Sequence, residues 1–153
     1  MNFEAIFQAS YERLIGGGVG ITDRGRRFFH RFYQNFLASS AQVRDKFQQT
    51  DMDRQVLVLQ KGLYHLISFY VTRTDNEYTH QIALSHSRAG YDISPELYEL
   101  WLESLVQTLE EMDPQYEPVQ GLAWRMVMMP GILYMQHHYE DSAKPMDDAS
   151  PGH

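Results

Sequence analysis

The chain has 153 residues, enough for one folded domain and too few for two of ordinary size. Hydrophobic residues make up 43% of it, which supplies a packed core and excludes global disorder. It contains no cysteine, so disulfide scaffolds, zinc fingers and iron–sulfur centres are excluded. The formal net charge of −7 argues against nucleic acid as the main partner.

No apolar stretch is long enough to cross a membrane, and the N-terminus shows no secretory signal. We therefore expect a cytoplasmic protein that acts without a membrane. The chain is rich in large apolar side chains, with 10 Tyr, 8 Phe and 8 Met. Such a supply suits either an ordinary core or the lining of a flat apolar ligand site.

Helical periodicity predicts the first elements. A helix over residues 2–15 is ended by the glycines of residues 16–20. Thr22 or Asp23 caps a second helix, which a serine pair ends before a short helical turn leads to Phe47. The buried stripe of this second helix consists of Phe28, Phe29, Phe32, Tyr33, Phe36 and Leu37.

A long helix is predicted next, from its cap at Asp51 to about Val71. Its buried stripe consists of Gln55, Leu59, Leu63, Leu66, Ile67 and Tyr70. After the polar residues 72–77, a shorter helix runs to about Ala89 and stops at Gly90.

Two further helices follow. Pro95 suits the first turn of one that ends before Pro114. The last helix runs from about Pro118 to Tyr139 and is apolar almost all round, so we expect it to be central. Pro130 within it predicts a kink.

No segment alternates as a strand does, and no repeat or domain linker is visible. The sequence therefore predicts an all-α domain of six or seven helices over residues 1–139. The polar residues 140–153, which include two prolines, are expected to form a disordered tail.

The seven histidines are the first candidates for chemistry. No HExxH motif exists, and the adjacent His137 and His138 point to different sides of a helix. His86 differs, because Ile82 and Ala83 place its imidazole on the apolar face of a short helix. Such an imidazole can serve as an axial ligand of haem iron. It can equally be a hydrogen-bonded core histidine, which is the commoner case.

The order of several motifs resembles the globin family, and most closely its bacterial members. The aromatic run over 28–37 resembles the family's B helix, and Phe47 falls where globins keep the phenylalanine that packs on the haem. His86-x-x-x-Gly90 followed by Pro95-Glu96-Leu97-Tyr98 resembles the proximal-histidine helix, its corner and the next helix. Ala123-Trp124 resembles the early dipeptide of the last helix.

The stretch Phe47-x-x-Thr50-Asp51-Met52-x-x-Gln55 also resembles sensor-type single-domain globins. The resemblance implies the globin fold, with six to eight helices in a three-over-three sandwich around haem b. It makes His86 the proximal ligand of iron, with Ser85 or a backbone carbonyl accepting a hydrogen bond from the other ring nitrogen. It also implies that Phe47, Leu59 and Tyr98 contact the cofactor, which a chain without cysteine holds without thioether bonds.

On the distal side, the resemblance points the Tyr33 hydroxyl into the pocket. If Leu59 faces the haem, Gln55 lies one turn earlier as a polar distal residue, whereas a shifted register would bury Lys61. Tyr33 could equally be a core aromatic, and Gln55 a solvated glutamine. His65 is expected to point off this face, so it is not a sixth ligand.

His30 and His80 are expected at the surface. Candidate partners of the haem propionates are Lys46, Arg54 and Arg88, each of which could also be an ordinary surface charge.

Ferrous haem with one imidazole and an open site binds O₂, CO or NO. The sequence favours an O₂-binding module or gas sensor. The alternatives are an NO dioxygenase served by a separate reductase and a haem-free globin used for interaction. A homodimer through the last two helices could use the Met-rich surface of residues 119–135, although the same residues could be intramolecular core.

Overall fold

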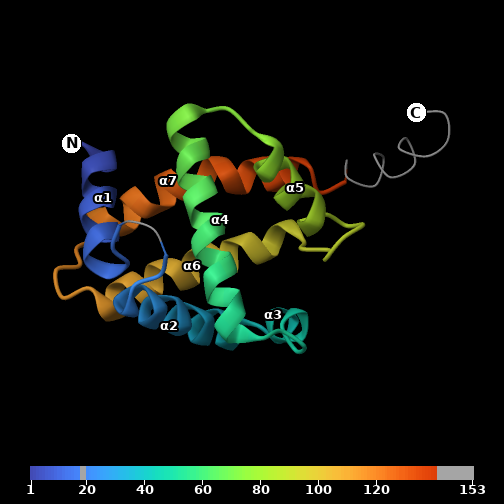
Figure 1. Ribbon diagram of the computed structural model, residues 1–153, viewed down its shortest axis with the longest axis horizontal. Helices are drawn as coiled ribbons and strands as arrows, with labels where there is room; N and C mark the ends of the chain where they lie inside the picture. Colours follow the sequence, from blue (N-terminus) through green and yellow to red (C-terminus); the bar gives the residue numbers. More distant parts are fainter. Residues whose placement is uncertain (18–19, 141–153) are drawn as a thin grey trace.

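The computed structural model describes residues 1–17 and 20–140 (Figure 1), so nearly all of the predicted tail lies outside the described residues. These residues form seven helices and no strand. The helices are α1 (Phe3–Leu14), α2 (Asp23–Ser39), α3 (Ala41–Lys46), α4 (Met52–Thr72), α5 (Glu77–His86), α6 (Pro95–Met112) and α7 (Pro118–His137). In the described part of the chain, no helix is both long and apolar enough to span a membrane.

Local sequence accounts for the helix ends. The Thr22 hydroxyl accepts a hydrogen bond from the Gly25 amide at 2.9 Å and so caps α2, while the Asp51 carboxylate caps α4. Asn76 caps α5 in the same way. Gly16 has a φ of +87°, a left-handed conformation that suits glycine just beyond the end of α1.

The helices form two layers. α1, α4 and α5 lie over α2, α6 and α7, with contacts between the layers from α4 to α2 and α7, and from α1 and α5 to α7. Figure 1 shows α4 crossing in front of α6 and α7. The predicted all-α fold with three-over-three layering is confirmed.

The close crossing of α4 over α7 depends on a glycine. A Cβ atom at Gly131 would overlap the Leu66 side chain, so the absence of a side chain lets the two helices approach. α7 continues through the preceding residue, Pro130, to His137.

α7 contacts α1, α4, α5 and α6, as expected of a central helix, but its apolar residues are not buried on every side. One face is buried, including Trp124, Val127 and Met128. The other presents an apolar stripe to solvent, because α7 lies at the outside of its layer. The exposed residues of this stripe are Leu122, Met126, Met129 and Leu133.

The predicted end of the fifth helix near Ala89 is wrong, since α5 ends at His86. Ser87 already has extended backbone dihedrals, with φ −72° and ψ 173°. Gly90 lies in the following loop, where a Cβ would overlap the Ser85 carbonyl. Glycine is therefore needed at position 90 because the backbone packs closely there, and not because the helix ends at this residue.

A polar network joins α2 to α6 beside the core. The buried Asn35 amide donates hydrogen bonds to Thr108 at 3.0 Å and to Glu111 at 2.8 Å. Arg31 pairs with the same carboxylate at 2.9 Å. Hydrogen bonds from Arg31 and Asn35 lower the pKa of Glu111 to about 2.

We predict that Glu111→Gln lowers the free energy of unfolding at neutral pH by about 1 kcal/mol or less, because the carboxylate is partly exposed. The folded pKa is below the unfolded one, so this stabilisation is present above about pH 4.5 and is lost toward pH 2. Urea unfolding of both proteins should show their difference shrinking across that range. Glu110→Gln, at an exposed neighbouring position, is the control. A difference that does not depend on pH would contradict the assignment.

Candidate functional site

A cavity of about 740 Å³ lies between α4 and α5 and is backed by α2, α6 and α7. Its volume is in the range of protein sites that bind small molecules and cofactors. All six residues predicted for the site line it, namely Tyr33, Phe47, Gln55, Leu59, His86 and Tyr98. The structure thus brings together residues as far apart in the chain as Tyr33 and Tyr98.

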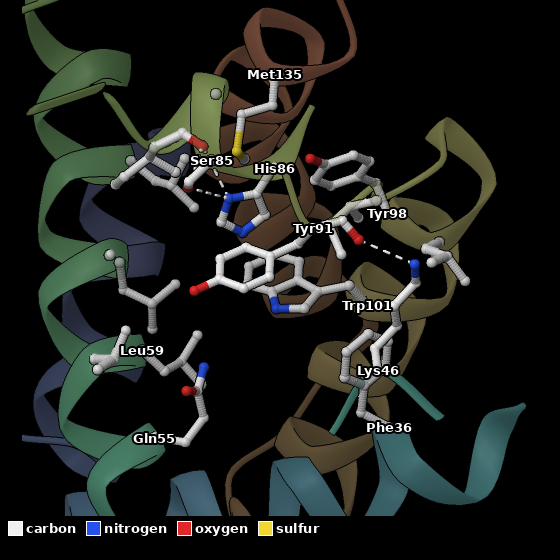
Figure 2. Close-up of a pocket in the computed structure, with 18 of the residues that line it drawn as sticks. Phe36, Lys46, Gln55, Leu59, Ser85, His86, Tyr91, Tyr98, Trp101 and Met135 are labelled. Atoms are coloured by element: carbon white, nitrogen blue, oxygen red, sulfur yellow. Dashed lines mark hydrogen bonds between the residues drawn. The ribbon is translucent and has the colours of Figure 1, made fainter. Parts of the chain in front are cut away.

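His86 enters this cavity from the last turn of α5 (Figure 2). Its Nδ1 atom lies 2.9 Å from the Ile82 carbonyl oxygen and 3.1 Å from the Ser85 hydroxyl. The Ser85 hydroxyl itself donates to the Ile82 carbonyl at 2.8 Å. Both acceptors considered from the sequence, the serine and a backbone carbonyl, therefore lie beside this nitrogen.

These contacts define the protonation of the His86 ring. A carbonyl oxygen can only accept, so Nδ1 carries the hydrogen and Nε2 keeps its lone pair in the neutral ring. Burial lowers the pKa of His86 and favours that neutral form, although the Ile82 carbonyl opposes the shift. Among the described residues Nε2 has no hydrogen-bond partner, and Figure 2 shows it turned into the cavity.

The polar groups of the opposite wall come from α2 and α4. Gln55 Nε2 donates a hydrogen bond to the Tyr33 hydroxyl at 3.1 Å. Burial raises the pKa of Tyr33 to about 12, so the hydroxyl stays protonated. Because it accepts from Gln55, its own hydrogen is available for a ligand in the cavity.

The remaining predicted residues form apolar walls. The Phe47 ring lies 5.6 Å from the Tyr33 ring, edge to face, and Leu59 is 9% exposed. Tyr98 is 6% exposed, and burial raises the pKa of its hydroxyl. No other described residue hydrogen-bonds this hydroxyl.

The predicted cationic residues separate into two groups. Lys46 and Arg54 line the cavity, and the Lys46 ammonium donates to the Tyr91 carbonyl at 2.9 Å. Arg88 does not line it and pairs with Glu140 at 2.7 Å. Only the first two are placed to meet acidic groups of a bound molecule.

His65 lines the cavity, contrary to the expectation that it points away. Its ring stacks on Tyr78 with centroids 3.8 Å apart, and its Nδ1 is buried without a hydrogen-bond partner. His30 and His80, expected at the surface, are partly buried and lie outside the cavity lining.

Several lining residues were missed in the sequence. Met135 shares a helical face with Ile132, a three-residue spacing that periodicity could have shown. Tyr91 lies in the loop after α5, where no periodicity exists, and Figure 2 shows its ring beside His86. Trp101 also lines the cavity, and only the packing of α6 decides which of its apolar residues face inward.

The fold, together with a cavity into which the unpaired Nε2 of His86 points, defines a globin-like protein. A crystal structure of protein PA3967 from Pseudomonas aeruginosa PAO1, described as structurally highly homologous to a human hemoglobin, superposes with a TM-score of 0.77. The sequences are 36% identical over 90% of this chain and 98% of that protein. The chain therefore belongs to the globin family.

Other comparisons gave no further relative. No family model matches the sequence, and no match was found among curated proteins.

Proposed function

We propose that the protein is a haem-b globin that binds O₂ and other diatomic gases reversibly. The observation that carries the proposal is the His86 imidazole, whose Nε2 lone pair faces an apolar cavity opposite the hydrogen-bonded Tyr33–Gln55 pair. When bound, haem would supply a ferrous iron with one coordination position open to a gas.

The residues present fit this cofactor. A neutral imidazole with Nδ1 bonded to a carbonyl is the form that ligates iron, and the Ile82 contact fixes its orientation. Phe47 and Leu59 would pack on the porphyrin, and Tyr98 would add to the apolar wall. Lys46 and Arg54 at the cavity lining would pair with the propionates.

The Tyr33–Gln55 pair would determine ligand preference. A gas whose outer oxygen carries partial negative charge is stabilised by a nearby O–H donor, whereas a less polar gas gains little. Gln55 holds the Tyr33 hydroxyl in place and occupies one of its acceptor sites. The pair would therefore favour O₂ over CO and slow the release of O₂.

We predict that the purified full chain binds one haem with a sharp Soret band and that His86→Ala loses this specific binding. The other described histidine in the cavity, His65, does not replace it, because its ring stacks on Tyr78. His80→Ala is the matched control, because His80 lies on the same helix outside the cavity lining. Absorption titration with haem checks both variants. Equal binding by His86→Ala and the wild type would refute the assignment of the ligand.

We predict that Tyr33→Phe releases O₂ roughly two- to tenfold faster, the factor that corresponds to one net hydrogen bond. CO release should change much less and serves as the internal reference. Stopped-flow or flash-photolysis kinetics measure both rates. An unchanged O₂ rate would show that this hydroxyl does not contact the ligand.

We propose sensing as the use of the gas, on the resemblance of residues 47–55 to sensor-type globins. The alternative, an NO dioxygenase, converts NO and O₂ to nitrate with electrons from a separate reductase. Sustained nitrate formation with an added reducing system would favour that alternative.

The exposed stripe on α7 supports a homodimer through the last two helices. Leu122, Met126, Met129 and Leu133 are 45%, 40%, 37% and 56% exposed, and they follow the spacing of a helix–helix contact. We predict that Met126→Glu converts a dimer to a monomer in sedimentation experiments. Tyr64→Glu, at a 65% exposed site on α4, should leave the dimer intact. A wild-type monomer at high concentration would reject this interface.

A further inference from the structure

Three side chains join α4 to the first turn of α5, and they are called here the α4–α5 stack: Lys61, His65 and Tyr78. The His65 and Tyr78 rings lie face to face, with centroids 3.8 Å apart and planes inclined by 19°. The Lys61 ammonium lies 4.7 Å from the centre of the same tyrosine ring. Stacking and cation–π contacts of this kind stabilise the approach of the two helices.

The α4–α5 stack holds a short helix at one end. α5 has 10 residues, with Tyr78 in its first turn and His86 at its last position. The two residues are about 12 Å apart along the helix axis. In the described part of the chain, side-chain hydrogen bonds and ion pairs join α4 to α2 and to Gly20, and none joins α4 to α5. Release of the stack would therefore loosen the helix that carries the imidazole.

The stacked His65 ring is in an environment that favours its neutral form. Its Nδ1 is buried without a hydrogen-bond partner, and no described carboxylate pairs with it. Glu77, which precedes Tyr78 in the chain, accepts a hydrogen bond from Gln81 at 2.7 Å instead. Burial and the Lys61 ammonium lower the pKa of His65 from its ordinary value of 6.5.

A proton on His65 would bring two cations onto one tyrosine ring. Lys61 and His65 are four positions apart on α4, so they lie on the same face of the helix. The other titratable groups beside the ring are phenols. Tyr64 lies on α4 with its ring centroid 5.1 Å away, and Tyr11 of α1 lines a second cavity, of about 440 Å³, that His65 also lines. Neither is a carboxylate that could compensate the added charge.

We infer that the α4–α5 stack is an acid-sensitive latch: protonation of His65 releases the first turn of α5 from α4 and loosens the helix that carries His86. Because the folded chain favours the neutral ring, the stabilisation is complete above pH 6.5 and is lost as the pH falls through the lowered pKa of His65. The latch belongs to the chain itself and needs no haem. Its effect on haem retention rests on the proposed role of His86 as iron ligand.

The first test uses the full chain without haem. Amide exchange of residues 80–86, corrected for the intrinsic rate at each pH, should accelerate roughly two- to tenfold between about pH 7.5 and about pH 5, the factor that corresponds to one aromatic contact. His65→Phe keeps a ring that can stack on Tyr78 but takes no proton, so its exchange should depend much less on pH. His30→Phe is the matched control, because His30 lies on α2 outside the cavity lining, and it should behave as the wild type does.

A histidine titration by NMR tests the charge assignment independently of the His65 variant. The His65 imidazole should titrate below pH 6.5. Lys61→Gln, at an exposed position, should raise the pKa of His65, because the neighbouring ammonium is removed. The pH midpoint of amide exchange in α5 should move upward with it. Lys61→Arg keeps the charge and should leave both values near those of the wild type.

The second test uses the haem-loaded chain. Haem transfer to an acceptor globin should accelerate on acidification, by a factor roughly two- to tenfold greater in the wild type than in His65→Phe. Acid also protonates His86 in both proteins, so the difference between them reports His65 alone. His30→Phe should again match the wild type.

The outcomes separate this inference from the proposed function. Equal acid dependence of amide exchange in His65→Phe and the wild type overturns the inference, and so does a His65 that titrates at or above pH 6.5. Equal acid dependence of haem transfer in the two proteins overturns it as well. If the wild type binds no haem, the proposed function fails, and amide exchange and the titration of the haem-free chain decide whether the latch exists.

Discussion

The hydrogen bond between the His86 ring and the Ile82 carbonyl is the contact on which the site depends. It fixes which ring nitrogen carries the hydrogen, since a carbonyl can only accept. It also joins the ring to a carbonyl one turn earlier on the same helix, so the orientation follows from α5 itself. The same contact leaves the lone pair of the other nitrogen directed into the cavity, where an apolar lining favours the neutral ring.

Around this contact the fold provides two walls of different character. α5 supplies the imidazole, while α2 and α4 supply the Tyr33–Gln55 pair across the cavity. The layered crossing of α4 over α7, allowed by Gly131, sets the separation of these walls. Packing of whole helices therefore places a donor hydroxyl and an imidazole on opposite sides of one apolar space.

The α5 end and the α7 end are coupled by ordinary polar contacts. α5 stops at His86, and the backbone turns back at once, with the Gly90 position packed against the Ser85 carbonyl. Tyr139 and Gln136 hold the outer side of the resulting loop. The exposed face of α7 lies on the same helix as Gln136, so an assembly formed there would be continuous with a helix that contacts the end of this loop.

The sequence by itself determined the helices, two of their caps and the six residues that meet at the cavity. Caps such as Thr22 and Asp51 act within one turn, and the apolar stripe of each helix shows which face is buried, so these features depend on local chemistry. Tertiary structure alone decided the end of α5 at His86, the position of His65 against Tyr78, and the exposure of one side of α7. Each depends on a contact between segments distant in the chain, and neither periodicity nor residue type shows which of two apolar faces finds a neighbour.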